Sequence, residues 1–113
     1  MHELSIACGI VRAAADEAAR HGAARVVKLD VVVGALSGVE PGALEFCFPA
    51  AAAGTVCEGA ELAIEVEPAT GRCDQCATTS EVRDFMSPCP NCGAWPLGLE
   101  GGRAMTLRAL EVS

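Results

Sequence analysis

Apolar and polar residues follow one another along this chain with periods that predict two helices and three strands. Between Leu4 and about Arg20 the chain is rich in alanine, and apolar residues recur every three or four positions: Ile6, Ile10, Val11, Ala14 and Ala18. The charged residues of this segment fall mostly on the opposite side of a helix. We therefore expect an amphipathic helix, and we expect Gly22 to end it.

Three later segments show the two-residue period of half-buried strands. In residues 26–34 (VVKLDVVVG), the side chains expected on the buried face are Val27, Leu29, Val31 and Val33. Residues 61–67 (ELAIEVE) alternate in the same way and are closed by Pro68. Residues 104–112 (AMTLRALEV) predict a final strand, and the slip in its alternation between Leu107 and Leu110 indicates a bulge.

A second helix is predicted between the first two strands. Within residues 37–54 (SGVEPGALEFCFPAAAAG), Pro41 marks the start, because proline is favoured in the first helical turn. The apolar residues that follow at helical spacing are Leu44, Cys47, Phe48 and Ala51. Pro49 interrupts this pattern, and we expect it to kink or end the regular helix, because proline has no N–H to donate and clashes with the preceding turn.

The order of these elements predicts an α+β fold. A helix between the first two strands allows them to pair in parallel through a right-handed crossover, and the last strand can return to the sheet after the cysteine-rich segment. We expect a small three-stranded mixed sheet covered by two helices, with an inserted cysteine module. The predicted division is an α+β domain of residues 1–70 plus 100–113 and a module of residues 71–99.

Composition and charge narrow the class of protein. With 113 residues, 51% of them hydrophobic but only 4% aromatic, the core of this single small domain must consist of valine, leucine, isoleucine and alanine. A formal net charge of −7 argues against a nucleic-acid partner, which needs clustered lysine and arginine. No run of eighteen apolar residues exists, so we expect no membrane span. Glu3, Arg12 and Asp16 do not fit a signal peptide, so we expect a cytoplasmic protein.

Four of the seven cysteines have the spacing of a metal site. Cys73-Asp-Gln-Cys76 and Cys89-Pro-Asn-Cys92 are separated by twelve residues, and two such turns can surround one ion with a tetrahedron of sulfurs. The pattern predicts a zinc ribbon in which zinc is structural, because four sulfur ligands leave no open coordination position. We expect the module to bury the few large apolar side chains near these cysteines: Val82, Phe85, Met86, Trp95 and Leu97.

Iron, redox and disulfide chemistry are less well supported at these cysteines. A rubredoxin-like iron site would use the same four sulfurs, and a redox dithiol would use one pair at a time. A disulfide framework is disfavoured by a reducing compartment and by the odd number of cysteines. The isolated cysteines, Cys8, Cys47 and Cys57, are interpreted as small buried hydrophobic residues without chemistry.

The amino terminus offers a second kind of metal site. The terminal amine of Met1, together with the amide and ring nitrogens of His2, can close fused chelate rings on one ion, and such a nitrogen-rich set favours Ni(II) or Cu(II) over zinc. The nitrogen donors must be deprotonated, so metal affinity should weaken below about pH 7. Glu3 can add a donor or favour the first helical turn by its charge, and Glu40 can be a ligand if the fold brings it near, or an ordinary helix cap. His2 alone is weak evidence, because most histidines at a chain end are only solvated.

Taken together, these motifs resemble the HypA/HybF family of nickel-insertion proteins. The likeness rests on Met-His-Glu-Leu-Ser at the start, on SGVEPGALEFCF and on the paired CDQC and CPNC, and it covers nearly the whole chain. It implies a nickel metallochaperone for [NiFe]-hydrogenase maturation, with a nickel site at Met1, His2, Glu3 and, with less support, Glu40, and a separate structural zinc site. It also implies two partners, the nickel-handling GTPase HypB and the hydrogenase large subunit, whereas a homodimer stays an open question.

The leading hypothesis is therefore a nickel carrier that is not an enzyme. The chain has no phosphate-binding loop, so nucleotide hydrolysis would belong to the partner. The competing class is a zinc-ribbon module for protein interaction without a nickel role. An enzyme ranks third, because no nucleophile and base pair up and the ribbon has no open metal position.

Overall fold

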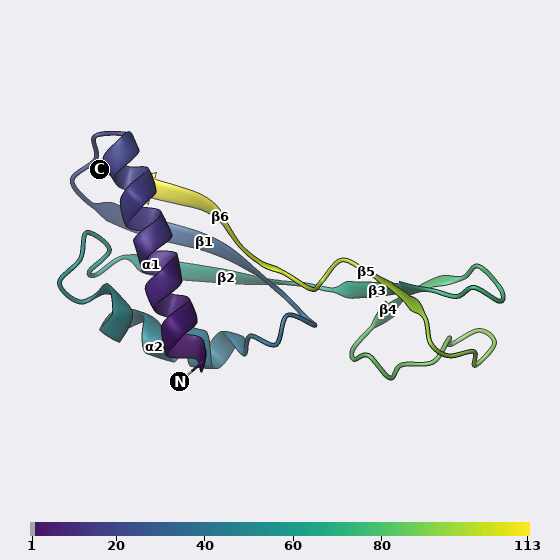
Figure 1. Cartoon of the computed structure of the whole chain (residues 1–113). Coiled ribbons are helices and arrows are strands. Elements are labelled where there is room, and N and C mark those ends of the chain that lie inside the picture. The colour runs from purple at the N-terminus through teal and green to yellow at the C-terminus, as the bar shows by residue number, and fades with distance from the viewer. Residues whose placement is uncertain (1) are drawn as a thin grey trace. The chain divides into compact units, whose positions relative to one another are not determined.

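The computed structural model describes residues 2–113 and has the predicted α+β architecture (Figure 1). Met1, one of the residues expected to bind nickel, lies outside the described residues. The elements are α1 (His2–Arg20), β1 (Val26–Gly34), α2 (Pro41–Ala52), β2 (Glu61–Glu67), β3 (Ala69–Arg72), β4 (Thr79–Val82), β5 (Gly98–Glu100) and β6 (Met105–Val112). No helix among residues 2–113 is long and apolar enough to cross a membrane.

Helix α1 is the predicted amphipathic helix. Its buried residues follow one stripe: Ala7, Ile10, Val11, Ala14 and Ala18. The helix ends as expected at Gly22, whose φ of +67° is a left-handed conformation that glycine adopts without steric cost. The N–H of Gly22 donates to the carbonyl of Ala19 at 3.1 Å, and the N–H of Ala23 donates to that of Ala18 at 2.9 Å. These two bonds form a Schellman motif, which satisfies the last carbonyls of the helix.

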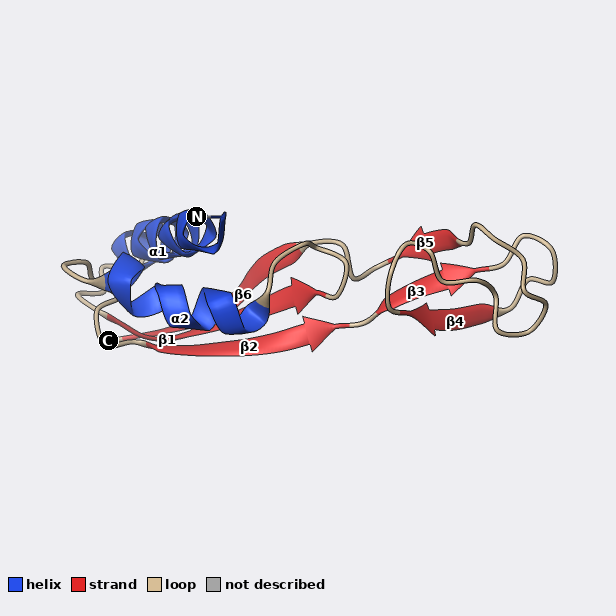
Figure 2. Cartoon of the chain, turned by 90° about the horizontal axis from the view of Figure 1, so that it is seen from below, coloured by secondary structure: helices blue, strands red, loops and turns tan. Residues whose placement is uncertain are grey.

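The first sheet is three-stranded and mixed, as predicted, and its strand order is β2-β1-β6. Near the start of β1 the N–H of Val26 donates to the carbonyl of Val56, and Ser113 at the end of β6 donates to Arg25, so β1 runs parallel to β2 and antiparallel to β6. Both helices lie on one side of this sheet (Figure 2). The expected buried face is correct for Leu29, Val31 and Val33 but wrong at the start of β1, where Val26 is buried and Val27 is 49% exposed.

Pro49 was expected to kink or end the second helix, and α2 does not end there. The helix continues through Pro49 to Ala52 and buries Leu44, Cys47, Phe48 and Ala52. Pro49 removes one donor from the helix, but its own carbonyl still accepts a hydrogen bond from the N–H of Ala53 at 3.1 Å. Burial of Phe48 and Ala52 on either side of it favours the continued helix. The predicted start is confirmed, with Pro41 in the first turn and Glu40 as the N-cap residue.

The chain divides into two compact units. The helical unit comprises Met1–Val32, Glu40–Glu65 and Thr106–Ser113, and the cysteine unit comprises Val33–Val39 and Val66–Met105. Within the cysteine unit a second antiparallel sheet, with the order β4-β3-β5, pairs Gly71 with both Ser80 and Leu99. These strands were not predicted from the sequence, because they are only three or four residues long and show no clear period.

The cysteine unit has a very small core. Its core cluster consists of Ala69, Cys73, Val82, Cys89 and Leu97, with Leu36, Ala94 and Leu99 packed against them. Five large apolar side chains were expected to be buried in this module, and only Val82 and Leu97 are. Phe85, Met86 and Trp95 are exposed, and they lie in the segment between β4 and β5 rather than in a strand of the sheet.

A pair of glycines allows close backbone packing in the cysteine unit. Gly101 and Gly102 both have left-handed backbones, with φ of +67° and +66°. The carbonyl of Gly102 accepts a hydrogen bond from the N–H of Leu36 at 2.6 Å. A Cβ atom on Gly102 would lie 2.5 Å from Ala69 Cα, whereas a Cβ on Gly101 would meet its nearest neighbour, Glu67 Oε1, at 3.5 Å. Of these two glycines, only Gly102 therefore combines backbone strain with a steric clash.

Gly102→Ala is expected to destabilise the protein more than its neighbour Gly101→Ala. Both variants place a side chain on a left-handed backbone, at a cost of about 1–2 kcal/mol. Gly102→Ala adds overpacking against Ala69, which costs roughly 1–3 kcal/mol more. Urea unfolding of the two variants measures the difference, and equal losses would show that the close approach of Gly102 to Ala69 has no energetic weight.

Candidate metal centre

The two Cys-x-x-Cys segments fold into matching turns. In the first, the N–H of Cys73 donates to the carbonyl of Thr78 at 2.9 Å and the N–H of Ala77 donates to that of Cys73 at 2.8 Å. In the second, Cys89 donates to Ala94 at 2.8 Å and Gly93 donates to Cys89 at 2.8 Å. The residue after each second cysteine has a left-handed backbone, with φ of 62° at Ala77 and 77° at Gly93. This shared geometry is that of a pair of metal knuckles.

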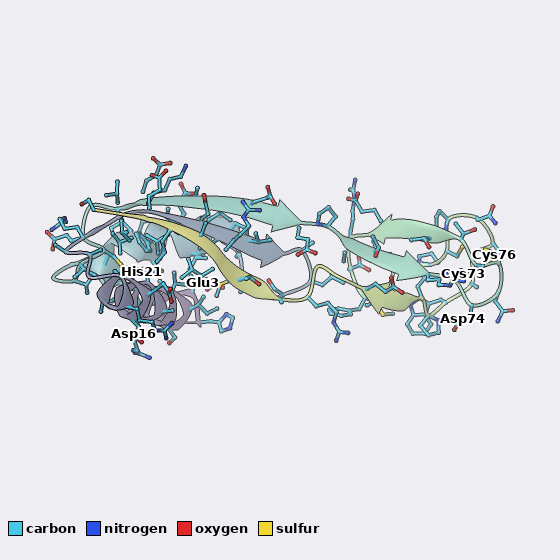
Figure 3. All side chains as sticks on the ribbon, turned by 90° about the horizontal axis from the view of Figure 1, so that it is seen from above. Glu3, Asp16, His21, Cys73, Asp74 and Cys76 are labelled. Atoms are coloured by element: carbon cyan, nitrogen blue, oxygen red, sulfur yellow. The ribbon has the colours of Figure 1, made fainter. Side chains whose placement is uncertain are left out.

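The turns bring all four predicted sulfur ligands together. The Sγ atoms of Cys73, Cys76, Cys89 and Cys92 all lie within 4.8 Å of one another. Cys73 Sγ is 3.5 Å from Cys92 Sγ, and Cys76 Sγ is 3.7 Å from Cys89 Sγ. A zinc ion with Zn–S bonds of about 2.3 Å separates its sulfurs by about 3.8 Å, so the cluster has the dimensions of a tetrahedral tetrathiolate site. Figure 3 shows Cys73 and Cys76, with Asp74 between them, in the turn that follows β3.

These distances favour one shared ion over two separate dithiols. The two close approaches each join one knuckle to the other, whereas a redox dithiol would pair the cysteines within a knuckle. All seven cysteines, which lie within the described residues 2–113, are free thiols. The cluster therefore has the donor set and geometry of a closed metal site.

The electrostatics of the cluster favour binding of a cation. Hydrogen bonds from the Asn91 side chain and then from the hydroxyl and N–H of Thr78 lower the pKa of the Cys76 thiol to about 5. The N–H of Ala94 acts in the same direction on Cys92, but the neighbouring sulfurs and burial together outweigh it and raise the pKa of Cys92 to about 12. One thiolate thus opposes the ionisation of the next, and a divalent ion removes that conflict by binding all four sulfurs as thiolates.

The three remaining cysteines are not at this centre. Cys47 and Cys57 are buried, as the sequence analysis expected. Burial raises the pKa of Cys57, and the Thr55 hydroxyl only partly offsets this effect. Cys8 is exposed, which corrects the expectation of a buried residue. The buried stripe of α1 runs through Ala7, Val11 and Ala14, and Cys8 is one residue outside it.

At the start of the chain, His2 and Glu3 occupy the first turn of α1. His2 Nδ1 lies 3.4 Å from Glu3 Oε2, and the two side chains are 65% and 21% exposed. A hydrogen bond from the His2 ring, followed by the N–H groups of Glu3 itself and of Glu40, lowers the pKa of the Glu3 carboxyl. The histidine ring and an ionised carboxylate are therefore next to each other at an exposed helix start.

The main chain of Glu40 lies close to His2 and Glu3, whereas its side chain caps helix α2. Its N–H is one of the groups that favour the ionised Glu3 carboxylate. Its own carboxylate caps α2, with Oε1 accepting from the N–H of Gly42 at 3.1 Å and Oε2 from that of Ala43 at 2.6 Å. Both oxygens are engaged in the capping interaction that stabilises the start of a helix.

His21, the other histidine, lies at the opposite end of α1. Its Nε2 is 3.1 Å from Glu17 Oε1, and Glu17 also accepts from Arg20 at 2.7 Å. All three residues line an open groove of about 750 Å³ between α1 and β6. Among residues 2–113, the four cysteine sulfurs form the one group of three or more candidate ligands, and His21 is not part of it.

Comparison with known proteins identifies the family. The family model described as "Hydrogenase/urease nickel incorporation, metallochaperone, hypA" matches residues 1–112. The chain belongs to the HypA family. Among its relatives, the hydrogenase maturation factor HypA of Chlorobaculum tepidum is 43% identical over 112 residues, which cover 99% of each chain. The HypA protein of Geobacter sulfurreducens is 42% identical with the same coverage.

Solved structures of HypA proteins have the same fold. The solution structure of the nickel metallochaperone HypA from Helicobacter pylori matches with a TM-score of 0.67 at 20% identity, and covers 97% of this chain and 96% of that one. A second HypA solution structure matches with a TM-score of 0.70 at 22% identity, and covers 100% of this chain and 97% of that one. At these identities the likeness concerns the fold alone.

The family resemblance and the fold expected from the sequence are thus both confirmed. HypA proteins are maturation factors and metallochaperones for nickel incorporation, and the family is not one of enzymes. The four cysteines that the sequence spacing predicted to meet form a cluster that could hold a metal ion. It would hold zinc through four thiolates, and the ion would supply a cross-link between the two knuckles.

Cys76→Ser is expected to abolish zinc binding and unfold the cysteine unit. The variant removes the thiol with the lowered pKa, and only five buried residues remain to hold the knuckles together. Structural zinc contributes on the order of 10 kcal/mol to the folding of such modules. Metal analysis and the amide spectrum of residues 66–105 test this, with Cys8→Ser, an exposed cysteine outside the cluster, as control. Native zinc content in Cys76→Ser would contradict the four-sulfur site.

Zinc affinity is expected to fall as the pH is lowered. Cys92, with a pKa of about 12, must give up its proton to bind zinc at any lower pH. Each displaced proton makes the affinity about tenfold weaker per pH unit of acidification. Competition with a chromogenic chelator between pH 8 and pH 5 measures this slope, and a pH-independent affinity would show that zinc binds without displacing thiol protons.

Proposed function

We propose that this protein carries Ni(II) on its N-terminal residues and delivers it during the maturation of [NiFe]-hydrogenase. The observation that carries the proposal is the pairing of His2 with an ionised Glu3 at the start of α1, in a chain of the HypA family. In this proposal residues 1–70 and 100–113 bind nickel, whereas residues 71–99 bind a structural zinc ion. The family description also includes urease, so urease is a second candidate recipient of the nickel.

The start of a helix suits this task for a simple reason. The first N–H groups of a helix have no acceptor within it, so the His2 amide can release its proton to solvent and bind a metal without breaking a helical hydrogen bond. The helix dipole opposes a cation at this end, and the Glu3 carboxylate offsets that effect. Nitrogen donors from Met1 and His2, completed by Glu3, make the site selective for Ni(II) over zinc.

Glu40 is the weakest of the four proposed nickel ligands. Its carboxylate already accepts two hydrogen bonds at the start of α2, and binding nickel would require it to leave that cap. Loss of such a cap costs about 1 kcal/mol. Its main-chain N–H can support the site without that cost, by keeping Glu3 ionised.

The two metal sites differ in a way that separates their roles. Four sulfurs around zinc leave no position for exchange, so zinc holds the cysteine unit together. The exposed nitrogen donors of His2 leave room for an incoming ligand, so nickel can pass to an acceptor by ligand exchange. In this proposal the GTPase HypB and the hydrogenase large subunit are the partners in that exchange.

His2→Ala is expected to weaken nickel binding at least tenfold and to leave zinc content unchanged. The variant removes the ring nitrogen from the chelate, and a tenfold loss of affinity corresponds to about 1.4 kcal/mol. His21→Ala is the matched control, because His21 is the other histidine in the chain and lies beside Glu17 at the far end of α1. Isothermal titration with Ni(II) on the zinc-loaded protein measures both variants.

A residue fused ahead of Met1 should have the same effect as His2→Ala. It converts the terminal amine into an amide and so removes another nitrogen donor while His2 stays in place. X-ray absorption on the nickel-loaded, untagged protein gives an independent measurement, in which we expect a histidine among the nickel ligands. Unchanged nickel affinity in both variants, or a nickel spectrum without histidine, would place the carrier site elsewhere.

A further inference from the structure

Most of the aromatic residues in this protein are on the surface rather than in the core. The chain contains only three phenylalanines and one tryptophan, and no tyrosine. Phe48 is buried at 4% exposure, but Phe46, Phe85 and Trp95 are 84%, 54% and 53% exposed. A chain with so few large apolar side chains would gain most stability by burying them. Their exposure therefore indicates a role outside the core.

Two of the exposed aromatics meet in the cysteine unit. The Trp95 ring nitrogen donates to the carbonyl of Phe85 at 3.3 Å, which joins the loop before the second knuckle to the loop after it. Met86, next to Phe85, is 69% exposed. We call Phe85, Met86 and Trp95 the aromatic patch.

Local hydrogen bonds hold the patch in place. Asp84 Oδ1 accepts from the N–H of Met86 at 2.8 Å and from the Ser87 hydroxyl at 3.3 Å, which makes an Asx turn. The turn presents Phe85 and Met86 outward. None of the three patch residues belongs to the core cluster of the unit or packs against it as Leu36, Ala94 and Leu99 do. The patch is thus ordered by polar contacts without serving the core.

We propose that the aromatic patch is a docking surface for a protein segment that combines apolar side chains with lysine or arginine. Tryptophan, phenylalanine and methionine are enriched at protein interfaces, and a few such residues carry most of the binding energy. This inference adds a partner surface to the proposed function and does not involve the nickel ligands. The inference rests on the proposed function in one respect, because the peptides that test it are taken from the partners in that function.

Charge determines the kind of partner. The cysteine unit has five acidic and three basic residues, a net charge of −2, and a zinc tetrathiolate adds about −2 more. A basic segment is attracted to this unit and can place a cation against the face of Trp95. A second copy of the chain has the same net charge of −7 and is repelled, as are anionic lipids.

Trp95 itself is the reporter for the test. It is the only tryptophan in the chain, so its emission reports on the patch alone. The zinc-loaded full chain is titrated with overlapping tryptophan-free peptides that cover HypB and the hydrogenase large subunit of the same organism. We expect a shift of the emission to shorter wavelength with peptides that carry both apolar and basic residues. No response to any peptide, or a response to acidic peptides only, would overturn the proposal.

Variants at the patch establish where the peptide binds. Phe85→Ser with Met86→Ser keeps the reporter, and it should weaken binding of the responding peptide at least tenfold while zinc content stays native. Phe46→Ser, which removes an exposed aromatic from the helical unit, is the matched control and should bind as the wild type does. If the double variant loses zinc, Met86→Lys and Met86→Glu replace it, with Lys expected to weaken binding more than Glu. A double variant that retains zinc and binds the peptide as tightly as the wild type would refute the docking surface. If the double variant loses zinc, equal binding by Met86→Lys, Met86→Glu and the wild type would refute it.

Separate measurements test whether a second copy of the chain or a membrane binds the aromatic patch instead, and whether the nickel proposal holds. Sedimentation that shows a dimer lost in Met86→Lys would assign the patch to a second copy, and binding to phosphatidylcholine vesicles with phosphatidylglycerol would assign it to a membrane. Either result overturns the proposal. Nickel titration of Met86→Lys should match that of the wild type. Native nickel binding without peptide docking would refute the docking surface alone, and docking without nickel binding would refute the carrier function alone.

Discussion

The convergence of four cysteine sulfurs is the constraint on which the cysteine unit depends. A core cluster of five residues and three short strands cannot offset the conformational entropy of the roughly fifty residues of this unit. Two of the five buried residues, Cys73 and Cys89, are themselves metal-ligand candidates, one from each knuckle. In this unit the metal site and the core are thus largely the same structure, and a cross-link at the sulfurs sets the positions of both loops around it.

The cysteine cluster and the proposed N-terminal nickel site have opposite chemical requirements. A structural ion needs a closed set of soft donors, and the sulfurs form one because each knuckle repeats the same pair of hydrogen bonds. A carried ion needs donors that can be exchanged, and the exposed first turn of α1 offers nitrogen and carboxylate groups of that kind. In the proposed function, the two donor sets lie in different parts of the chain, which reduces competition between zinc and nickel for the same ligands. The helical unit buries mostly aliphatic side chains and only one aromatic residue, Phe48. Phe85, Met86 and Trp95 are exposed and give the cysteine unit a surface with the composition of an interface.

The sequence by itself determined the features that depend on local spacing and donor chemistry. The helical and strand periods predicted α1, β1, α2, β2 and β6, and the Cys-x-x-Cys pairs predicted which four of seven cysteines meet. Gly22 marked the end of α1 because the left-handed turn after a helix is a local property. The resemblance to a family rested on the same short motifs.

Only the tertiary structure decided what depends on neighbours distant in the sequence. It showed that Val26 rather than Val27 is buried, that α2 continues past Pro49, and that Phe85, Met86 and Trp95 are exposed. It also brought the main chain of Glu40 to Glu3 while the Glu40 carboxylate caps α2. Residue type specifies which donors and apolar groups a segment can offer. Packing between segments decides whether a donor is free or already hydrogen-bonded, and whether an apolar group is exposed or buried. No local sequence pattern encodes that packing.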